Sequence, residues 1–102
     1  MKITWSPLAI ERVAEQARVI ARDKPEAAVR WAEGILSAVD RLESNPLSGR
    51  EVPEIRRTEV REIIQTGYRI IYRVAEDEVF ILTVCSSWRL LDPLEIDPPP
   101  AD

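Results

Sequence analysis

The side chains best suited to chemistry in this sequence are arginines in its middle third. Residues 50–73 hold six arginines and four glutamates, whereas the 102-residue chain as a whole has a net charge of −4. The guanidinium group presents a planar fork of donors that suits phosphate or carboxylate. Arg69 and Arg73 stand four residues apart in an alternating run, so they would share one face of a strand. They either line a phosphate site or form the solvated face of a half-buried sheet.

Groups for acid–base or metal chemistry are scarce in the chain. There is no histidine, and Cys85 is the only cysteine, so neither an internal disulfide nor a Cys/His zinc site can form. A catalytic base near neutral pH would have to be Glu, Asp, Lys, Tyr or Arg, and Glu62 would serve only if its pKa were raised. We expect Cys85 to be a small buried core residue, and we expect no metal and no cofactor.

Length and composition indicate one globular domain. The chain is 45% hydrophobic and 31% charged, and 102 residues suffice for a single core. Its apolar stretches are shorter than the roughly 20 residues of a membrane span, and Met1–Trp5 lacks the apolar run of a signal peptide. We therefore expect a soluble, cytoplasmic protein that does not contact a membrane. Because its net charge is negative, the electrostatic potential of the chain as a whole does not attract nucleic acid.

The first half of the chain predicts a short strand followed by two helices. Residues 2–5 alternate as in a strand, and Ser6 before Pro7 is typical of a helix N-cap. The first helix should bury an apolar stripe of Ile10, Val13, Ala14, Ala17, Ile20 and Ala21.

The second helix should begin with Asp23 and Glu26 as a capping box and end before Asn45 and Pro46. Its buried stripe is Ala28, Trp31, Ala32, Ile35, Val39 and Leu42. The short connection between the two helices predicts an antiparallel hairpin.

The second half of the chain predicts an antiparallel meander. Residues 46–54 have the composition of a loop, and strand-like runs follow at 59–65, 68–75 and 79–86. Residues 92–102 hold four prolines and four acids, and we expect a tail without regular structure there. The predicted fold is α+β with the order β-α-α-β-β-β, in one domain over residues 1–91: an N-terminal strand and a helix hairpin packed on a small antiparallel sheet.

This order of elements, together with specific residues, resembles the RelE/ParE family of toxins from type II toxin–antitoxin systems. The resemblance runs from about residue 2 to residue 91. The residues that carry it are Trp5-Ser6-Pro7 with Ala9, Asn45–Glu54, Arg61-Glu62, Tyr68–Val74 and Val79–Val84. The tyrosine–arginine strand at 68–74, followed by an acidic turn, is the most specific part.

The resemblance implies one of two activities. RelE-like members cut mRNA in the ribosome with basic residues on the sheet and near the end of the last strand, whereas ParE-like members block DNA gyrase and lack that set. Arg69 matches the family arginine, but the preceding strand lacks the paired lysines of the nucleases. The last strand ends Cys85-Ser86-Ser87-Trp88-Arg89, where only Arg89 is a basic match. The chain is therefore expected to be closer to ParE.

We accordingly expect a non-enzymatic DNA gyrase inhibitor that arrests growth, serves plasmid stabilization and is neutralised by a cognate antitoxin. Operator DNA would be bound only through the antitoxin. The candidates for target binding are Arg61, Arg69, Arg73, Trp88 and Arg89.

Two alternatives stay open. One is a RelE-like, ribosome-dependent mRNA endonuclease that would use Arg69, Arg73 and Arg89; the other is a degenerate, non-toxic module that only binds the antitoxin. An exposed edge strand and an uncovered arginine face predict that the chain forms a tight complex with its antitoxin.

Overall fold

The computed structural model describes residues 1–96 and has the predicted α+β order of elements. The elements are β1 (Lys2–Trp5), α1 (Pro7–Ala21), α2 (Pro25–Asp40), the 3-10 turn η1 (Arg41–Glu43), β2 (Arg50–Glu51), β3 (Val60–Gln65), β4 (Tyr68–Val74), β5 (Glu78–Ser86) and the 3-10 turn η2 (Pro93–Glu95). The two-residue strand β2 lies inside the segment predicted as loop.

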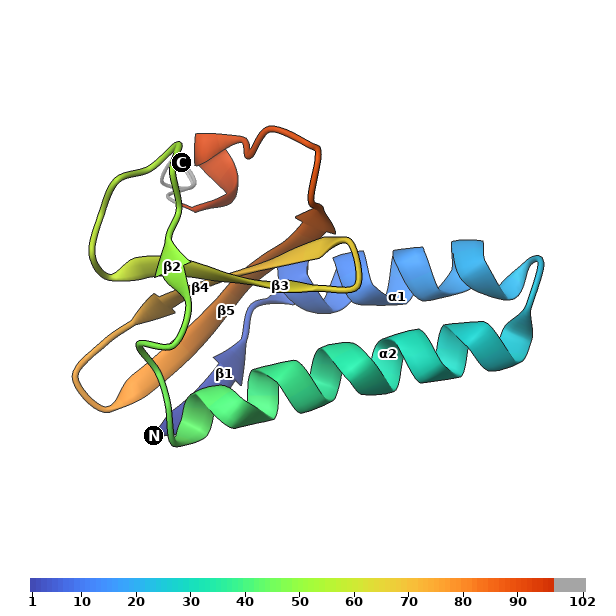
Figure 1. Ribbon diagram of the computed structural model, residues 1–102, viewed down its shortest axis with the longest axis horizontal. Helices are drawn as coiled ribbons and strands as arrows, with labels where there is room; N and C mark the ends of the chain where they lie inside the picture. Colours follow the sequence, from blue (N-terminus) through green and yellow to red (C-terminus); the bar gives the residue numbers. More distant parts are fainter. Residues whose placement is uncertain (97–102) are drawn as a thin grey trace.

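The five strands form one mixed sheet with the order β1-β5-β4-β3-β2. The predicted meander of β3, β4 and β5 is antiparallel, and the N-terminal strand β1 lies parallel to β5, with Lys2 opposite Glu78. The two helices form the predicted antiparallel hairpin, and its turn extends beyond the sheet (Figure 1). Neither helix of residues 1–96 is long and apolar enough to cross a membrane.

The helix starts confirm one predicted cap and correct another. The Ser6 hydroxyl accepts a hydrogen bond from the Ala9 N–H at 3.0 Å and donates one to the Leu82 carbonyl at 2.8 Å, so it caps α1 and ties it to β5. The predicted capping box at Asp23 is wrong. Lys24 is the N-cap of α2 without a side-chain bond, and Pro25, whose φ is already helical, starts the helix.

The core under the helices is built mainly by α2 rather than α1. The stripe predicted for the second helix is confirmed at Ile35 and Val39 of α2 and at Leu42 of η1, which are at most 1% exposed. On α1 the predicted stripe is only half-buried: Val13 packs against the core, but Ala9 is the one fully buried residue of the helix, and the prediction is wrong for Ile10, which is 56% exposed. Because the hairpin extends past the sheet, the apolar stripe of α1 faces an open groove instead of a covered core.

A second, smaller core lies on the other face of the sheet. It is covered by the loop of residues 52–59 and by residues 87–96, which we call the C-terminal strap. The buried side chains there are Val52, Val60, Ile71, Cys85, Leu91 and Ile96. The expected burial of Cys85 is confirmed, whereas the expected lack of regular structure after residue 91 is wrong for Pro93–Glu95. Residues 97–102 of the predicted tail lie outside the described residues.

Gly49 closes the sheet edge against Tyr72. The buried Tyr72 hydroxyl accepts a hydrogen bond from the Gly49 N–H at 2.9 Å. A Cβ atom at Gly49 would lie 2.5 Å from the Glu62 carbonyl oxygen and 2.5 Å from the Tyr72 hydroxyl oxygen. This close backbone approach leaves no room for a side chain.

Replacing Gly49 by alanine should therefore destabilise the fold by about 1 to 3 kcal/mol, because backbone or a packed ring must move. Urea unfolding followed by circular dichroism measures the change. Gly34→Ala is the matched control: its Cβ meets only the end of the Gln65 side chain at 3.2 Å, and alanine favours a helix, so that variant should be as stable as the wild type or more so. Equal stabilities of the Gly49→Ala variant and the wild type would contradict the packing described.

Candidate functional site

Arg69 is buried on the strap face of the sheet and is held by several acceptors. Its side chain is 6% exposed. Its Nε atom donates to Glu62 Oε1 at 2.7 Å, and its Nη1 and Nη2 atoms donate to the two Glu54 oxygens at 2.8 Å each. Nη1 also donates to the Arg89 carbonyl at 3.1 Å. Four of the five guanidinium N–H groups are thus accounted for.

The two glutamates extend this cluster to the rest of the sheet face. Glu62 is 1% exposed, and its second oxygen accepts from Arg50 Nε at 2.6 Å. Glu54 Oε2 also accepts the Leu91 N–H at 3.0 Å. We call Arg69, Glu54 and Glu62 the arginine clamp: it joins β3, β4, the 52–59 loop and the C-terminal strap at one point.

Charge pairing fixes the protonation states of Glu54 and Arg69. The hydrogen bonds from Arg69, more than the opposing effect of burial, hold the pKa of Glu54 down to about 2, from an ordinary value of 4.5. The same bonds raise the pKa of Arg69 above its ordinary value. The ion pair is therefore fully charged at neutral pH.

The expectation of an uncovered arginine face is wrong for Arg69. The alternation itself is confirmed, because Arg69 and Arg73 both lie on the face of β4 opposite the helices. Arg73, however, stacks on the Phe80 ring, with 4.5 Å between its Cζ atom and the ring centroid. Arg69 is covered because the strap and the 52–59 loop, which carries Glu54, fold over this face.

The other predicted residues take separate positions. Arg61 donates to the carbonyls of Thr58 at 3.0 Å and Gly49 at 2.9 Å, so it supports the loops on either side of β2. The Arg89 guanidinium pairs with Glu95 at 3.4 Å. Trp88 is 82% exposed. The structure thus brings the backbone of residue 89 to Arg69 but does not gather the five candidates into one site.

This arrangement leaves the arginine clamp without a free cation or a free base. A phosphate could bind Arg69 only by displacing a carboxylate, and each Glu62 oxygen already accepts from an arginine. Sequence reasoning identified Arg69 and Glu62 but missed Glu54, whose role depends on the fold of a loop 15 residues away.

An apolar concavity lies on the helix hairpin, where the sequence predicted core. It has a volume of about 500 Å³ and is lined by Trp5, Ile10, Val13, Ala14, Ala17, Ala32 and Leu36. A second hollow of about 340 Å³ shares Ala17 and Ala32 and continues toward the turn between the helices. We call the two together the hairpin groove. Its alanine floor would let a partner helix approach closely.

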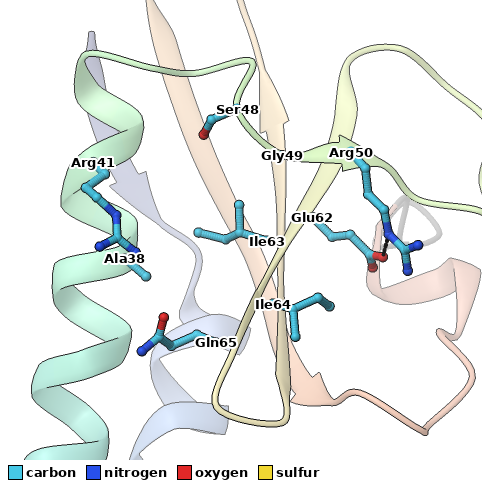
Figure 2. Close-up of a pocket in the computed structure, with 9 residues that line it drawn as sticks. All are labelled: Ala38, Arg41, Ser48, Gly49, Arg50, Glu62, Ile63, Ile64 and Gln65. Carbon is cyan, nitrogen blue, oxygen red and sulfur yellow. Dashed lines mark hydrogen bonds and ion pairs between the residues drawn. The ribbon is translucent and has the colours of Figure 1, made fainter.

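A third hollow lies at the edge of the sheet, between α2 and β3 (Figure 2). Its volume is about 360 Å³, and Arg41 and Arg50 stand on its two sides. The short strand β2 pairs only with Arg61 and Glu62, so within residues 1–96 no strand pairs with the outer side of residues 63–65. This open edge offers backbone hydrogen bonds to an extended segment.

A family model described as "ParE toxin of type II toxin-antitoxin system, parDE" matches residues 3–90. The chain belongs to this ParE toxin family. It is also 39% identical over 83 residues to the protein named "Putative toxin Y4kP" of Sinorhizobium fredii (strain NBRC 101917 / NGR234), an alignment that covers 81% of this chain and 84% of that protein.

A solved structure shares the fold of this ParE-family chain. It is titled "Chromosomal ParDE TA system from P. aeruginosa" and superimposes with a TM-score of 0.68 at 24% identity, covering 84% of this chain and 95% of that chain. The predicted resemblance to the family, and the predicted fold, are confirmed.

The low pKa of Glu54 gives this ParE-family chain a specific acid sensitivity. Because the folded pKa of about 2 lies below the ordinary 4.5, Glu54 stabilises the fold fully above about pH 4.5, and this contribution is lost as the pH falls toward 2. Glu54→Gln should lower the free energy of unfolding by about 1 to 3 kcal/mol at pH 7. The difference in this free energy between the variant and the wild type should shrink as the pH falls from about 4.5 to about 2. Urea midpoints measured from pH 7 to pH 2 test this.

Glu76→Gln is the matched control, because Glu76 lies exposed in the turn between β4 and β5. It should track the wild type at every pH. A Glu54→Gln variant that does the same would show that the ion pair with Arg69 contributes nothing.

Proposed function

We propose that this chain is the toxin of a type II toxin–antitoxin pair, that it acts in the cytoplasm by inhibiting DNA gyrase, and that it has no enzymatic activity of its own. Family membership supports the toxin role. The observation that carries the choice of target is the state of Arg69. This arginine, which a related nuclease would aim at a phosphate, is buried and bonded to Glu54 and Glu62.

The remaining cations give the nuclease alternative little support. Cleavage of RNA through its own 2′-OH needs a base, an acid and a cation beside the phosphate. Arg73 lies over a phenylalanine ring and Arg89 pairs with Glu95, and the chain has no histidine. An inhibitor that works by contact alone needs none of these groups to be free.

The hairpin groove supports neutralisation by an antitoxin. An apolar groove with an alanine floor fits the apolar face of an amphipathic helix. The same helix α2 borders the open edge of β3, where Arg41 and Arg50 would attract an acidic extended segment. We propose that the antitoxin covers both places, and that operator DNA is bound only through the antitoxin, because this chain is itself acidic.

A gyrase assay tests the proposed function directly. The purified chain is added to gyrase, ATP and relaxed plasmid, and the reaction is stopped with a protein denaturant. We expect loss of supercoiling or accumulation of trapped linear DNA, reversed by prior addition of the antitoxin. A folded chain that has no effect at any ratio would overturn the gyrase proposal. Mapping of mRNA ends after induction would then distinguish a nuclease from a non-toxic module.

A charge placed in the hairpin groove should separate toxicity from neutralisation. Ala17→Glu or Ala32→Glu puts a carboxylate against the apolar floor, so we expect antitoxin affinity to fall at least about 30-fold while growth arrest persists. Titration calorimetry with the purified antitoxin measures the loss. Ser37→Glu, on the exposed surface of the same helix, should bind as the wild type does. Unchanged affinity in the Ala17→Glu and Ala32→Glu variants would place the antitoxin elsewhere.

A further inference from the structure

Two large apolar side chains project from the C-terminal strap. Trp88 and Leu90 are each 82% exposed, more than any other large apolar residue of the described chain. Their neighbour Leu91 is 5% exposed and packs in the second core. The strap thus buries Leu91 and Ile96 but presents Trp88 and Leu90 to solvent, at a cost in hydration free energy that the fold itself does not recover.

The backbone that carries these two residues is fixed on both sides. The Ser87 N–H donates to the Gly67 carbonyl at 2.8 Å, and the Leu91 N–H donates to Glu54 at 3.0 Å. Between Trp88 and Leu90, the Arg89 carbonyl accepts from the buried Arg69 at 3.1 Å. These bonds hold the backbone at residues 87, 89 and 91, so the two side chains project from an ordered base.

We propose that Trp88 and Leu90 are paired apolar anchors that enter an apolar pocket on the protein target of the toxin, and that Arg69 is the residue that positions them. The inference rests on the proposed function and adds the contact residues. Exposed tryptophan on a rigid base is typical of interface hot spots, and prior ordering of the strap lowers the entropy cost of binding. Leu90 was not among the residues singled out from the sequence.

Charge and position favour a protein target over the other partners. Residues 87–96 carry Arg89 against Asp92 and Glu95, so this surface does not attract the phosphates of RNA or DNA. The strap runs from the end of β5 (Figure 1) and touches α1 through the ion pair of Glu95 with Arg12 at 3.2 Å, but none of its residues lines the hairpin groove. An antitoxin in the hairpin groove therefore leaves the two anchors on a separate surface. The occupant of the strap is therefore a second protein rather than the helix that fills the groove.

Removal of the anchors tests the contact. In the gyrase assay, Trp88→Ala and Leu90→Ala should each raise the half-maximal inhibitory concentration at least about 30-fold, the loss that truncation of a hot-spot side chain produces. Thermal stability and antitoxin affinity should stay at wild-type values. Leu47→Ala is the matched control, because Leu47 is also exposed, at 62%, but lies in the loop before β2. This variant should inhibit gyrase and bind the antitoxin as the wild type does.

The positioning role of Arg69 needs a readout that stability alone does not move. In a chain with Trp5→Phe and Trp31→Phe, Trp88 is the remaining tryptophan, and time-resolved fluorescence anisotropy reports its local motion. Arg69→Lys keeps the charge but lacks the fork that reaches the Arg89 carbonyl. It should widen the motion of Trp88 and weaken inhibition about 3- to 10-fold at a temperature where the variant is fully folded.

The outcomes separate this inference from the proposed function. If the wild type inhibits gyrase and the anchor variants inhibit it equally, the proposed anchor role is wrong and the proposed function is supported.

If the wild type does not inhibit gyrase, the proposed function is wrong, and growth arrest then tests the anchor role. Loss of growth arrest in the Trp88→Ala and Leu90→Ala variants would support another protein target. Undiminished growth arrest in these variants would overturn the anchor role. Cleavage of mRNA by the wild type that the anchor variants lose would make the contact one to RNA and overturn the protein target. Unchanged anisotropy in the Arg69→Lys variant would overturn the positioning role.

Discussion

The fold on the strap side of the sheet depends on one constraint: a guanidinium taken out of water must keep its charge and find acceptors. Arg69 meets it with carboxylates from a loop and from β3, and with the Arg89 carbonyl of the strap. Removing one partner of Arg69 is destabilising, by about 1 to 3 kcal/mol for the partly exposed Glu54, because the charge left behind stays desolvated. The three segments can therefore pack on this face only together.

This constraint also separates two roles that one arginine can play in this fold. An arginine that stabilises a transition state must present free donors to the substrate. In this chain the donors point into the protein, and the strap that covers them presents Trp88 and Leu90 outward. We propose that Arg69 instead holds the strap in position, through its bond to the Arg89 carbonyl.

Local signals in the sequence predicted local structure well. Three of these signals act within a few residues, and the structure confirms all three: Ser6 before Pro7, the alternation at Tyr68–Val74, and the apolar spacing of Ile35, Val39 and Leu42. Long-range pairing could not be derived in this way. The role of Glu54 depends on where a loop crosses the sheet, and the open stripe of α1 depends on how far the hairpin extends past it. Composition indicates an irregular acidic tail after residue 91, yet Ile96 supplies an apolar side chain to the second core.

Amide hydrogen exchange at Leu91 tests the closed strap most directly, because its N–H is bonded to Glu54 across the arginine clamp. If the strap is held shut, this amide should exchange slowly, with protection close to that of Ile70 in the central strand β4. Exchange at Leu91 as fast as at the exposed Glu76 in the β4–β5 turn would contradict the account. It would mean that Arg69 does not hold the strap on the sheet.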